Sequence, residues 1–418
     1  MTSPAIAPGD LEPLLAAVDG LRMAAVVAGL ADVPLAGRRV GTPGGAAARV
    51  LLGRHLADLG ATVRLDIFPV SAVPEVYAAP AVSWGDGTSG GHLRFGREVL
   101  PHLASADEPL LRRAGLAAAG QGDPAGCWLV VPDRMSLFEA YGHAHGALGL
   151  LIGRTVDEDG WHYTMLAGSA PGPLPILTVD GDTHALMRQL AEARSGWLAA
   201  NAPIRRVDVR AANVLGRWRP AHQGRPDLLL TAHYDGVGDL PGLRQPSAAD
   251  NGSGVAVVLE AARILAPALP DGVGFAVALL DAEEVGALGS ARHAAQLRDD
   301  DAAPLVINID GAGVLREAAA VEAGGPAHGL LAALDQAGRH TGLPLAAGPV
   351  ASDNRRYAAA GLASVGIGAG MAGYHSPADT ADRVEPTTLT AVARLVVATA
   401  WLTAHAPATL SSLIGDER

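Results

Sequence analysis

The sequence contains no lysine and a single cysteine, Cys127. All 31 basic residues are therefore arginine, which excludes a lysine Schiff base, ordinary pyridoxal-phosphate chemistry and phosphate loops that depend on lysine. One cysteine cannot form an intramolecular disulfide or supply a cysteine-based zinc site. With 43 acidic residues the formal net charge is −12, which argues against a nucleic-acid partner, because nucleic-acid binders present a basic face.

Long apolar runs are also missing. The most apolar stretches, 23–37 and 391–404, are interrupted by Asp32 and Arg394, and neither reaches the roughly 18 apolar residues that a membrane helix needs. The N-terminus lacks the basic segment of a secretory signal. We expect a cytoplasmic protein with no membrane partner, whereas a chain from which a leader had been removed would be secreted.

The composition is that of a globular protein, with 49% hydrophobic and 18% charged residues over 418 positions, a length that suggests two or three domains. Residues 1–75 predict helices, the first at 11–30, followed by a strand. Residues 76–207 contain short apolar runs between loops rich in glycine and proline, with a helix at 181–198. We therefore expect a small β-rich domain at 76–207, inserted between the N-terminal segment 1–75 and the main domain 208–418.

The main domain shows a regular alternation of strands and helices. The predicted strands are 227–233, 273–281, 304–310 and 363–368, and the predicted helices are 252–265, 286–297, 327–341 and 386–405. Apolar strands of this kind indicate an α/β fold with a mostly parallel central sheet flanked by helices on both faces. Ligands of such sheets bind outside the carboxyl ends of the strands.

Polar residues with metal-binding side chains gather at those carboxyl ends and in the loops that follow. They are His233, Asp235, Asp250, Glu283, Glu284, Asp310 and His375. Nitrogen and carboxylate ligands without thiolates are typical of a catalytic zinc site. Five ligand positions with a bridging carboxylate are what two ions about 3.5–4 Å apart require.

The motifs around these residues form a recognisable set: HYD, DNGSGVAVVLEAARIL, DAEEVGALGS, INIDGAG, SDNRRYAAAGL and YHSPADT. Together they resemble the M28 family of dinuclear zinc aminopeptidases over residues 216–404. The resemblance implies the zinc-peptidase fold, a catalytic domain at 208–418 and two bound Zn²⁺ ions. It also implies one ion on His233 and Asp310, the other on Glu284 and His375, and a bridge between them by Asp250.

The same resemblance implies roles for three further residues. Glu283 would be the general base that takes a proton from the zinc-bridging water and returns it to the leaving amine. Asp235 would orient His233, and Tyr374 would stabilise the developing oxyanion. We expect an exopeptidase that removes N-terminal residues from peptides or peptide-like molecules.

Two other functions are compatible with the same ligand set. One is an amidohydrolase or carboxypeptidase of the same fold that acts on an N-acyl group or a biosynthetic intermediate. The other is a non-catalytic binding protein, although such proteins usually lose ligands and none is lost here. A zinc-dependent cyclase is less favoured, because that chemistry needs only one metal ion. The related M20 peptidases usually carry their extra domain after the Glu-Glu pair, whereas here the insertion precedes His233.

Within the inserted region, residues 126–153 and 174–190 resemble a protease-associated (PA) domain. That resemblance implies a role in shaping or covering the substrate cleft, and the alternative is a spacer that only stabilises the protein or makes it dimerise. Two smaller expectations concern the main domain. Ser352 and Asp353 are expected to cap the helix that follows them. Asp379 and Thr380 are expected to hold the loop of His375 and to orient that histidine.

Overall fold

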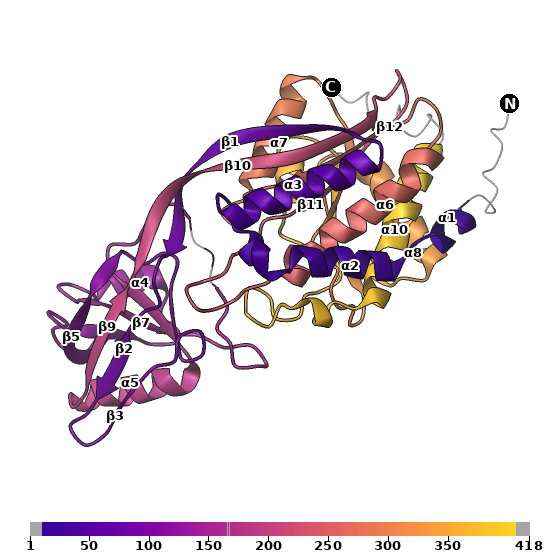
Figure 1. Cartoon of the computed structure of the whole chain (residues 1–418). Helices are drawn as coiled ribbons and strands as arrows, with labels where there is room; N and C mark the ends of the chain where they lie inside the picture. The colour runs from indigo at the N-terminus through magenta and orange to yellow at the C-terminus, as the bar shows by residue number, and fades with distance from the viewer. Residues whose placement is uncertain (1–10, 165, 167, 407–418) are drawn as a thin grey trace.

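Two eight-stranded sheets form the framework of the protein (Figure 1) within the residues that the computed structural model describes, 11–164, 166 and 168–406. The first sheet has the strand order β1-β10-β12-β11-β13-β16-β14-β15. Its strands are β1 (Thr62–Val76), β10 (Ile204–Arg219), β11 (Asp227–His233), β12 (Gly274–Leu280), β13 (Leu305–Ile309), β14 (Ala319–Gly324), β15 (Leu345–Ala347) and β16 (Ser364–Gly368).

The four central strands of this sheet, β12, β11, β13 and β16, pair in parallel. The pairs β1–β10, β10–β12 and β14–β16 are antiparallel, so the sheet carries antiparallel strands on both sides of its parallel centre. The predicted α/β fold with a mostly parallel central sheet is confirmed, and the antiparallel flanks are an addition to it.

Helices cover both faces of the first sheet. They are α1 (Glu12–Ala16), α2 (Gly20–Leu30), α3 (Pro43–Asp58), α6 (Gly254–Ala268), α7 (Leu288–Asp299), α8 (His328–Thr341), α9 (Asn354–Ala359) and α10 (Pro386–His405). Leu228 and Leu230 of β11 pack in one core with residues of α2, α3, α6, α8 and α10. Leu229 packs on the other face, with Ala294 of α7 and Tyr357 of α9. Burial on both faces explains why the central strands are largely apolar on both faces.

Helix α10 is, among the described residues, the one helix long and apolar enough to cross a membrane by length and composition. However, 72% of its most apolar window is buried inside the protein. Leu389, Val392, Leu395 and Val396 of this helix all belong to the larger core. Its apolar character is therefore accounted for by its packing in that core.

The second sheet lies apart from the first and forms the lobe at the lower left of Figure 1. Its elements are β2 (Val82–Gly85), β3 (Gly90–His92), β4 (Val99–Pro101), β5 (Glu108–Ala118), β6 (Trp128–Val131), α4 (Leu137–Gly142), β7 (Gly149–Gly153), β8 (Ile176–Val179), α5 (Gly181–Ala193) and β9 (Trp197–Ala202). The long antiparallel strands β1 and β10 lead into it and out of it. All its strands lie within the region 76–207, and the division of the chain into domains stays a prediction.

Two predicted helices differ from the structure by more than a few residues. The helix expected at 11–30 is divided into α1 and α2, because the side chain of Asp19 accepts hydrogen bonds from the backbone N–H groups of Leu21 and Arg22 and starts a new helix there. The helix expected at 181–198 ends at Ala193. Arg194 adopts the left-handed conformation that closes a helix, and the chain then enters β9.

Candidate metal centre

The five predicted metal ligands come from separate elements that meet at one edge of the first sheet. His233 is the last residue of β11, and Asp310 directly follows β13. Asp250 lies in the turn before α6, Glu284 in the loop between β12 and α7, and His375 in the loop after β16. All five side chains are buried. The parallel centre of the sheet brings them together, because parallel strands end at the same edge.

The five ligands form two groups that share Asp250. Group A is His233, Asp250 and Asp310, and group B is Asp250, Glu284 and His375. In group A, Nε2 of His233 lies 3.3 Å from Oδ1 of Asp250 and 3.4 Å from Oδ1 of Asp310. In group B, Nε2 of His375 lies 3.0 Å from Oδ2 of Asp250 and 2.9 Å from Oε2 of Glu284. Asp250 thus turns one oxygen toward each group.

The donor atoms of the two groups fit divalent cations. Nε2 of His233, Oε1 of Glu284 and Oδ1 of Asp310 are buried and have no hydrogen-bond partner among the described residues. A buried polar atom without a partner costs free energy, and all three of these atoms belong to groups A and B. The ligand atoms of each group lie within 4.8 Å of one another, and the donor set of imidazole nitrogens and carboxylates is that of zinc.

Burial displaces the pKa values of this cluster. It raises the pKa of Glu284 to about 7 and raises the pKa of Glu283 well above its ordinary range. Burial lowers the pKa values of His233 and His375, but the facing carboxylates outweigh it and raise both well above the ordinary value. His233 and His375 therefore retain their protons, and Glu284 retains its proton below about pH 7. Metal ligands must be deprotonated, so a cation that binds here displaces them.

Asp235 connects group A to the glutamate pair. Nδ1 of His233 lies 3.1 Å from the backbone carbonyl oxygen of Asp235 and 3.6 Å from its Oδ1. The Asp235 carboxylate accepts hydrogen bonds from the backbone N–H groups of Glu283, at 3.0 Å, and Glu284, at 3.2 Å. The contact of Asp235 with the histidine is therefore made mainly by its backbone, while its side chain holds the loop that carries both glutamates.

Glu283 and Tyr374 lie beside the two groups without belonging to either. Glu283 is half-buried and adjoins the ligand Glu284. The ring of Tyr374 stacks on that of His375 with 3.7 Å between the ring centroids, and Tyr374 is 44% exposed. Both residues thus stand where the buried cluster meets solvent, which is where a substrate would approach it.

Asp379 holds Asp250, and the expectation that it orients His375 is wrong. Its Oδ1 accepts a hydrogen bond from the backbone N–H of Ala249 at 2.6 Å, and its Oδ2 accepts one from that of Asp250 at 3.0 Å. Nδ1 of His375 instead faces the backbone carbonyl of Thr164, at 3.2 Å. Asp379 therefore positions the ligand that is common to both groups.

The expectation that Ser352 and Asp353 cap a helix is also wrong. Helix α9 starts after Asp353, but the Asp353 side chain makes no capping hydrogen bond. Oγ of Ser352 instead accepts a hydrogen bond from Nδ2 of Asn308, at 3.2 Å. Burial raises the pKa of Asp353 to about 7, and the proximity of this carboxylate contributes to the raised pKa of Glu283.

Arg38 is a fully buried residue that no motif in the sequence singles out. Its guanidinium group donates hydrogen bonds to four backbone carbonyls, those of Leu30, Tyr234, Pro246 and Ser247. Tyr234 follows the ligand His233, and Ser247 precedes the turn that carries Asp250. Arg38 also lies near the carboxylates of Asp379, Asp235 and Asp250. It is thus a buried cation that fixes the loops of the site.

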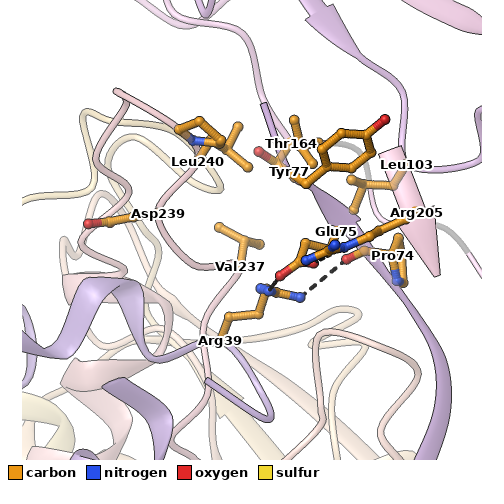
Figure 2. Close-up of a pocket in the computed structure, with 12 residues that line it drawn as sticks. Arg39, Pro74, Glu75, Tyr77, Leu103, Thr164, Arg205, Val237, Asp239 and Leu240 are labelled. Carbon is orange, nitrogen blue, oxygen red and sulfur yellow. Dashed lines mark hydrogen bonds and ion pairs between the residues drawn. The ribbon is translucent and has the colours of Figure 1, made fainter. Parts of the chain in front are cut away.

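A cavity of about 340 Å³ lies where the region 76–207 meets the main domain (Figure 2). It is lined by Arg39, Glu75, Tyr77, Leu103, Thr164, Arg205, Val237, Asp239 and Leu240, among others. Glu75 receives hydrogen bonds from Arg39 and from Arg205, each at 2.6 Å. None of the five predicted ligands lines this cavity, and Thr164 connects it to His375.

Comparison with known proteins finds a family model that matches the part of the chain carrying both groups. Residues 213–400 match the model of peptidase family M28. The aminopeptidase YwaD of Bacillus subtilis is 35% identical over 99 residues, which cover 23% of this chain and 20% of that protein. An aminopeptidase of Pseudomonas aeruginosa is 31% identical over 164 residues, which cover 38% of this chain and 28% of that protein. The matched stretches thus span less than a third of either relative.

Among solved structures, a zinc aminopeptidase from Bacillus subtilis superimposes with a TM-score of 0.72 at 18% sequence identity. The superposition covers 94% of this chain and 97% of that one, so the likeness in fold extends over both sheets. The matched residues 213–400 contain group A, group B, Glu283 and Tyr374. Through these residues, the chain is similar to peptidase family M28.

Proposed function

We propose that the protein is a dinuclear zinc aminopeptidase that hydrolyses N-terminal residues of peptides or peptide-like molecules. The observation that carries this proposal is the arrangement around Asp250. Its two carboxylate oxygens face two separate sets of buried donors, His233 with Asp310 and Glu284 with His375. One carboxylate between two such sets is what a pair of neighbouring ions requires.

In this proposal His233 and Asp310 would hold one zinc ion, Glu284 and His375 would hold the other, and Asp250 would bind both. Zinc bound in such a site supplies Lewis acidity, which lowers the pKa of water and polarises a carbonyl group. Asp235 and Asp379 keep the ligands in place through the backbone contacts described above.

Glu283 is the proton carrier of the proposed reaction. Its carboxylate takes a proton from the attacking water and gives it to the nitrogen of the leaving amine. Both steps need a carboxylate that is not itself a ligand, and Glu283 lies beside the ligand Glu284 but outside both groups. The hydrogen bond from its backbone N–H to Asp235 fixes the loop from which its side chain extends.

Tyr374→Phe is expected to lower kcat roughly 100-fold while leaving KM and zinc content close to those of the wild type. The substitution removes one hydroxyl donor from the developing oxyanion and keeps the ring that stacks on His375. Steady-state kinetics on a peptide substrate, with zinc measured by elemental analysis, test this expectation. An unchanged kcat would show that the hydroxyl of Tyr374 does not contact the transition state.

The proposal as a whole is tested with a peptide library. Purified zinc-loaded protein is incubated with free-amine, N-acetylated and C-amidated peptides of matched sequence, and the products are identified by mass spectrometry. Stepwise loss of N-terminal residues from free-amine peptides only is the expected result. Cleavage of N-acetylated peptides alone would favour an amidohydrolase, and zinc-loaded protein that cleaves none of the peptides would contradict the proposed activity.

The proposal also covers the domain organisation and the location of the protein. Residues 1–75 and 208–418 form the catalytic domain, and residues 76–207 form an inserted PA-like domain. The second sheet, which lies wholly between Val82 and Ala202, supports that division. The cytoplasmic location stays a prediction from the sequence.

A further inference from the structure

The connection between β7 and β8 contains Thr164, which contacts the loop that carries His375. The backbone N–H of Thr164 donates a hydrogen bond to the carbonyl oxygen of His375, at 2.8 Å. In return, Nδ1 of His375 lies 3.2 Å from the carbonyl oxygen of Thr164. Both residues are buried, and they lie 211 positions apart in the sequence.

This contact determines which nitrogen of His375 can bind a metal. A carbonyl oxygen only accepts hydrogen bonds, so Nδ1 of His375 must carry the proton that lies between them. When the ring is neutral, as a metal ligand must be, the lone pair is on Nε2, which faces Asp250 at 3.0 Å and Glu284 at 2.9 Å. The Thr164 carbonyl thus selects the imidazole tautomer that group B requires.

The two histidines of the site differ in which segment supplies the carbonyl oxygen that faces Nδ1. Nδ1 of His233 faces the carbonyl of Asp235, which is two residues away on the same loop. Nδ1 of His375 depends on a carbonyl from the connection between β7 and β8. His375 also has a φ angle of 52°, in the left-handed region, where a residue other than glycine needs support from its surroundings.

Thr164 is held in place by polar contacts. Its Oγ1 donates a hydrogen bond to Oε1 of Gln245, at 3.0 Å. A second contact joins the loop of His375 to the connection between β7 and β8. Oγ of Ser376 donates a hydrogen bond to Oδ2 of Asp157, at 2.6 Å. Thr164 also lines the cavity of Figure 2, so it is not packed against protein on every side. The two backbone contacts with His375 hold the Thr164 carbonyl directly, and these polar contacts add to them.

We infer that the Thr164 backbone is a positioning group for His375, through which the connection between β7 and β8 sets the zinc affinity of group B. This inference rests on the proposed function, because it assumes that groups A and B each hold an ion. It gives Thr164 a specific task at the metal centre, namely to hold the tautomer and the ring orientation of one ligand.

The test is a zinc titration of Thr164→Pro. Proline removes the N–H group that binds the His375 carbonyl, and its ring displaces the neighbouring backbone. Zinc-free protein is titrated with Zn²⁺ against a chromophoric chelator, with His233→Ala and His375→Ala as references for groups A and B. We expect Thr164→Pro to bind zinc at group B about 10- to 100-fold more weakly than the wild type and at group A as tightly.

Thr164→Val is the matched control, because it removes the hydroxyl contact with Gln245 and keeps both backbone contacts with His375. Its affinity at group B is expected to stay within about 3-fold of the wild type. Cobalt substitution gives a second readout, since the visible absorption of Co²⁺ at group B should change in Thr164→Pro and not in Thr164→Val. Thermal melts of the zinc-free variants show whether each remains folded.

The possible outcomes separate this inference from the proposed function. Wild-type affinity at group B in folded Thr164→Pro overturns the inference and leaves the proposed function intact. Both are overturned if the wild-type protein binds only one zinc ion, or if the binding of the second ion is unchanged in His375→Ala. If Thr164→Pro does not fold, Ser376→Ala decides, because it removes the contact with Asp157. It also removes the hydrogen bond that Oγ of Ser376 accepts from the backbone N–H of Ala378. Weaker binding at group B in Ser376→Ala supports the inference, and unchanged binding there overturns it.

Discussion

Replacement of Glu283 by glutamine is expected to lower kcat by about 10²- to 10⁴-fold while the protein keeps its full zinc content. Glutamine has nearly the same shape as glutamate, but its amide cannot take a proton from water. Glu283 belongs to neither ligand group, so its loss should not release metal. The expected signature is therefore a large fall in kcat, little change in KM and unchanged metal content, measured by steady-state kinetics and elemental analysis.

Glu192→Gln is the matched control for this prediction. Glu192 lies on α5, far from the ligands in the sequence, and its carboxylate is half exposed in a loose pair with Arg188. The same chemical change there should leave both kcat and metal content unaffected. If Glu283→Gln turned over at the wild-type rate, another group would have to carry the proton. If Glu283→Gln lost zinc, Glu283 would be a ligand.

The ligand groups could be predicted from the sequence because each ligand lies in a short local pattern. An apolar strand that ends in His233 or is followed by Asp310 presents a metal-binding side chain at a sheet edge, and the parallel connection of the strands brings such edges together. The bridging place of Asp250 was implied by resemblance to a family. The structure adds the distances, which show one Asp250 oxygen facing each group.

The residues that support the site could not be predicted in this way. Arg38 meets the carbonyl of Tyr234 across 196 positions, and Thr164 meets His375 across 211. Both contacts involve backbone carbonyls, which every residue has, so no residue type marks the partner. Asp379 was assigned to the wrong partner because it lies only four positions after His375. In the structure its carboxylate accepts hydrogen bonds from the backbone N–H groups of Ala249 and Asp250. Closeness in sequence therefore did not predict which residues the Asp379 carboxylate contacts in the folded chain.

Strand β10 illustrates a different limit of the sequence pattern. It alternates charged and apolar residues and pairs antiparallel with β1 from Val76↔Ile204 to Thr62↔Arg217. The near-continuous apolar runs that mark the buried parallel strands are missing from it, because its flank of the sheet is only partly covered. The sequence pattern therefore predicted the parallel centre of the first sheet correctly and missed part of its antiparallel flank.

Arg38→Met is expected to destabilise the folded protein by about 3–5 kcal/mol. Methionine fills much of the same space, but it leaves four carbonyl oxygens without their donor: Leu30 at 2.7 Å, Tyr234 at 2.8 Å, Pro246 at 2.9 Å and Ser247 at 2.6 Å. Arg54→Met is the control, because Arg54 is exposed on α3. Urea unfolding of both variants measures the difference in the free energy of unfolding.

The destabilisation should extend to the metal centre, because the carbonyls that Arg38 binds flank two ligands. The loop of Tyr234 starts at His233, and Ser247 lies three residues before Asp250. Loosening these loops should weaken zinc binding at both groups, since Asp250 is common to them. This pattern differs from that of Thr164→Pro, which should affect group B alone. If Arg38→Met unfolded at the same urea concentration as Arg54→Met, water would have replaced the guanidinium group as the hydrogen-bond donor. Arg38 would then fix neither loop.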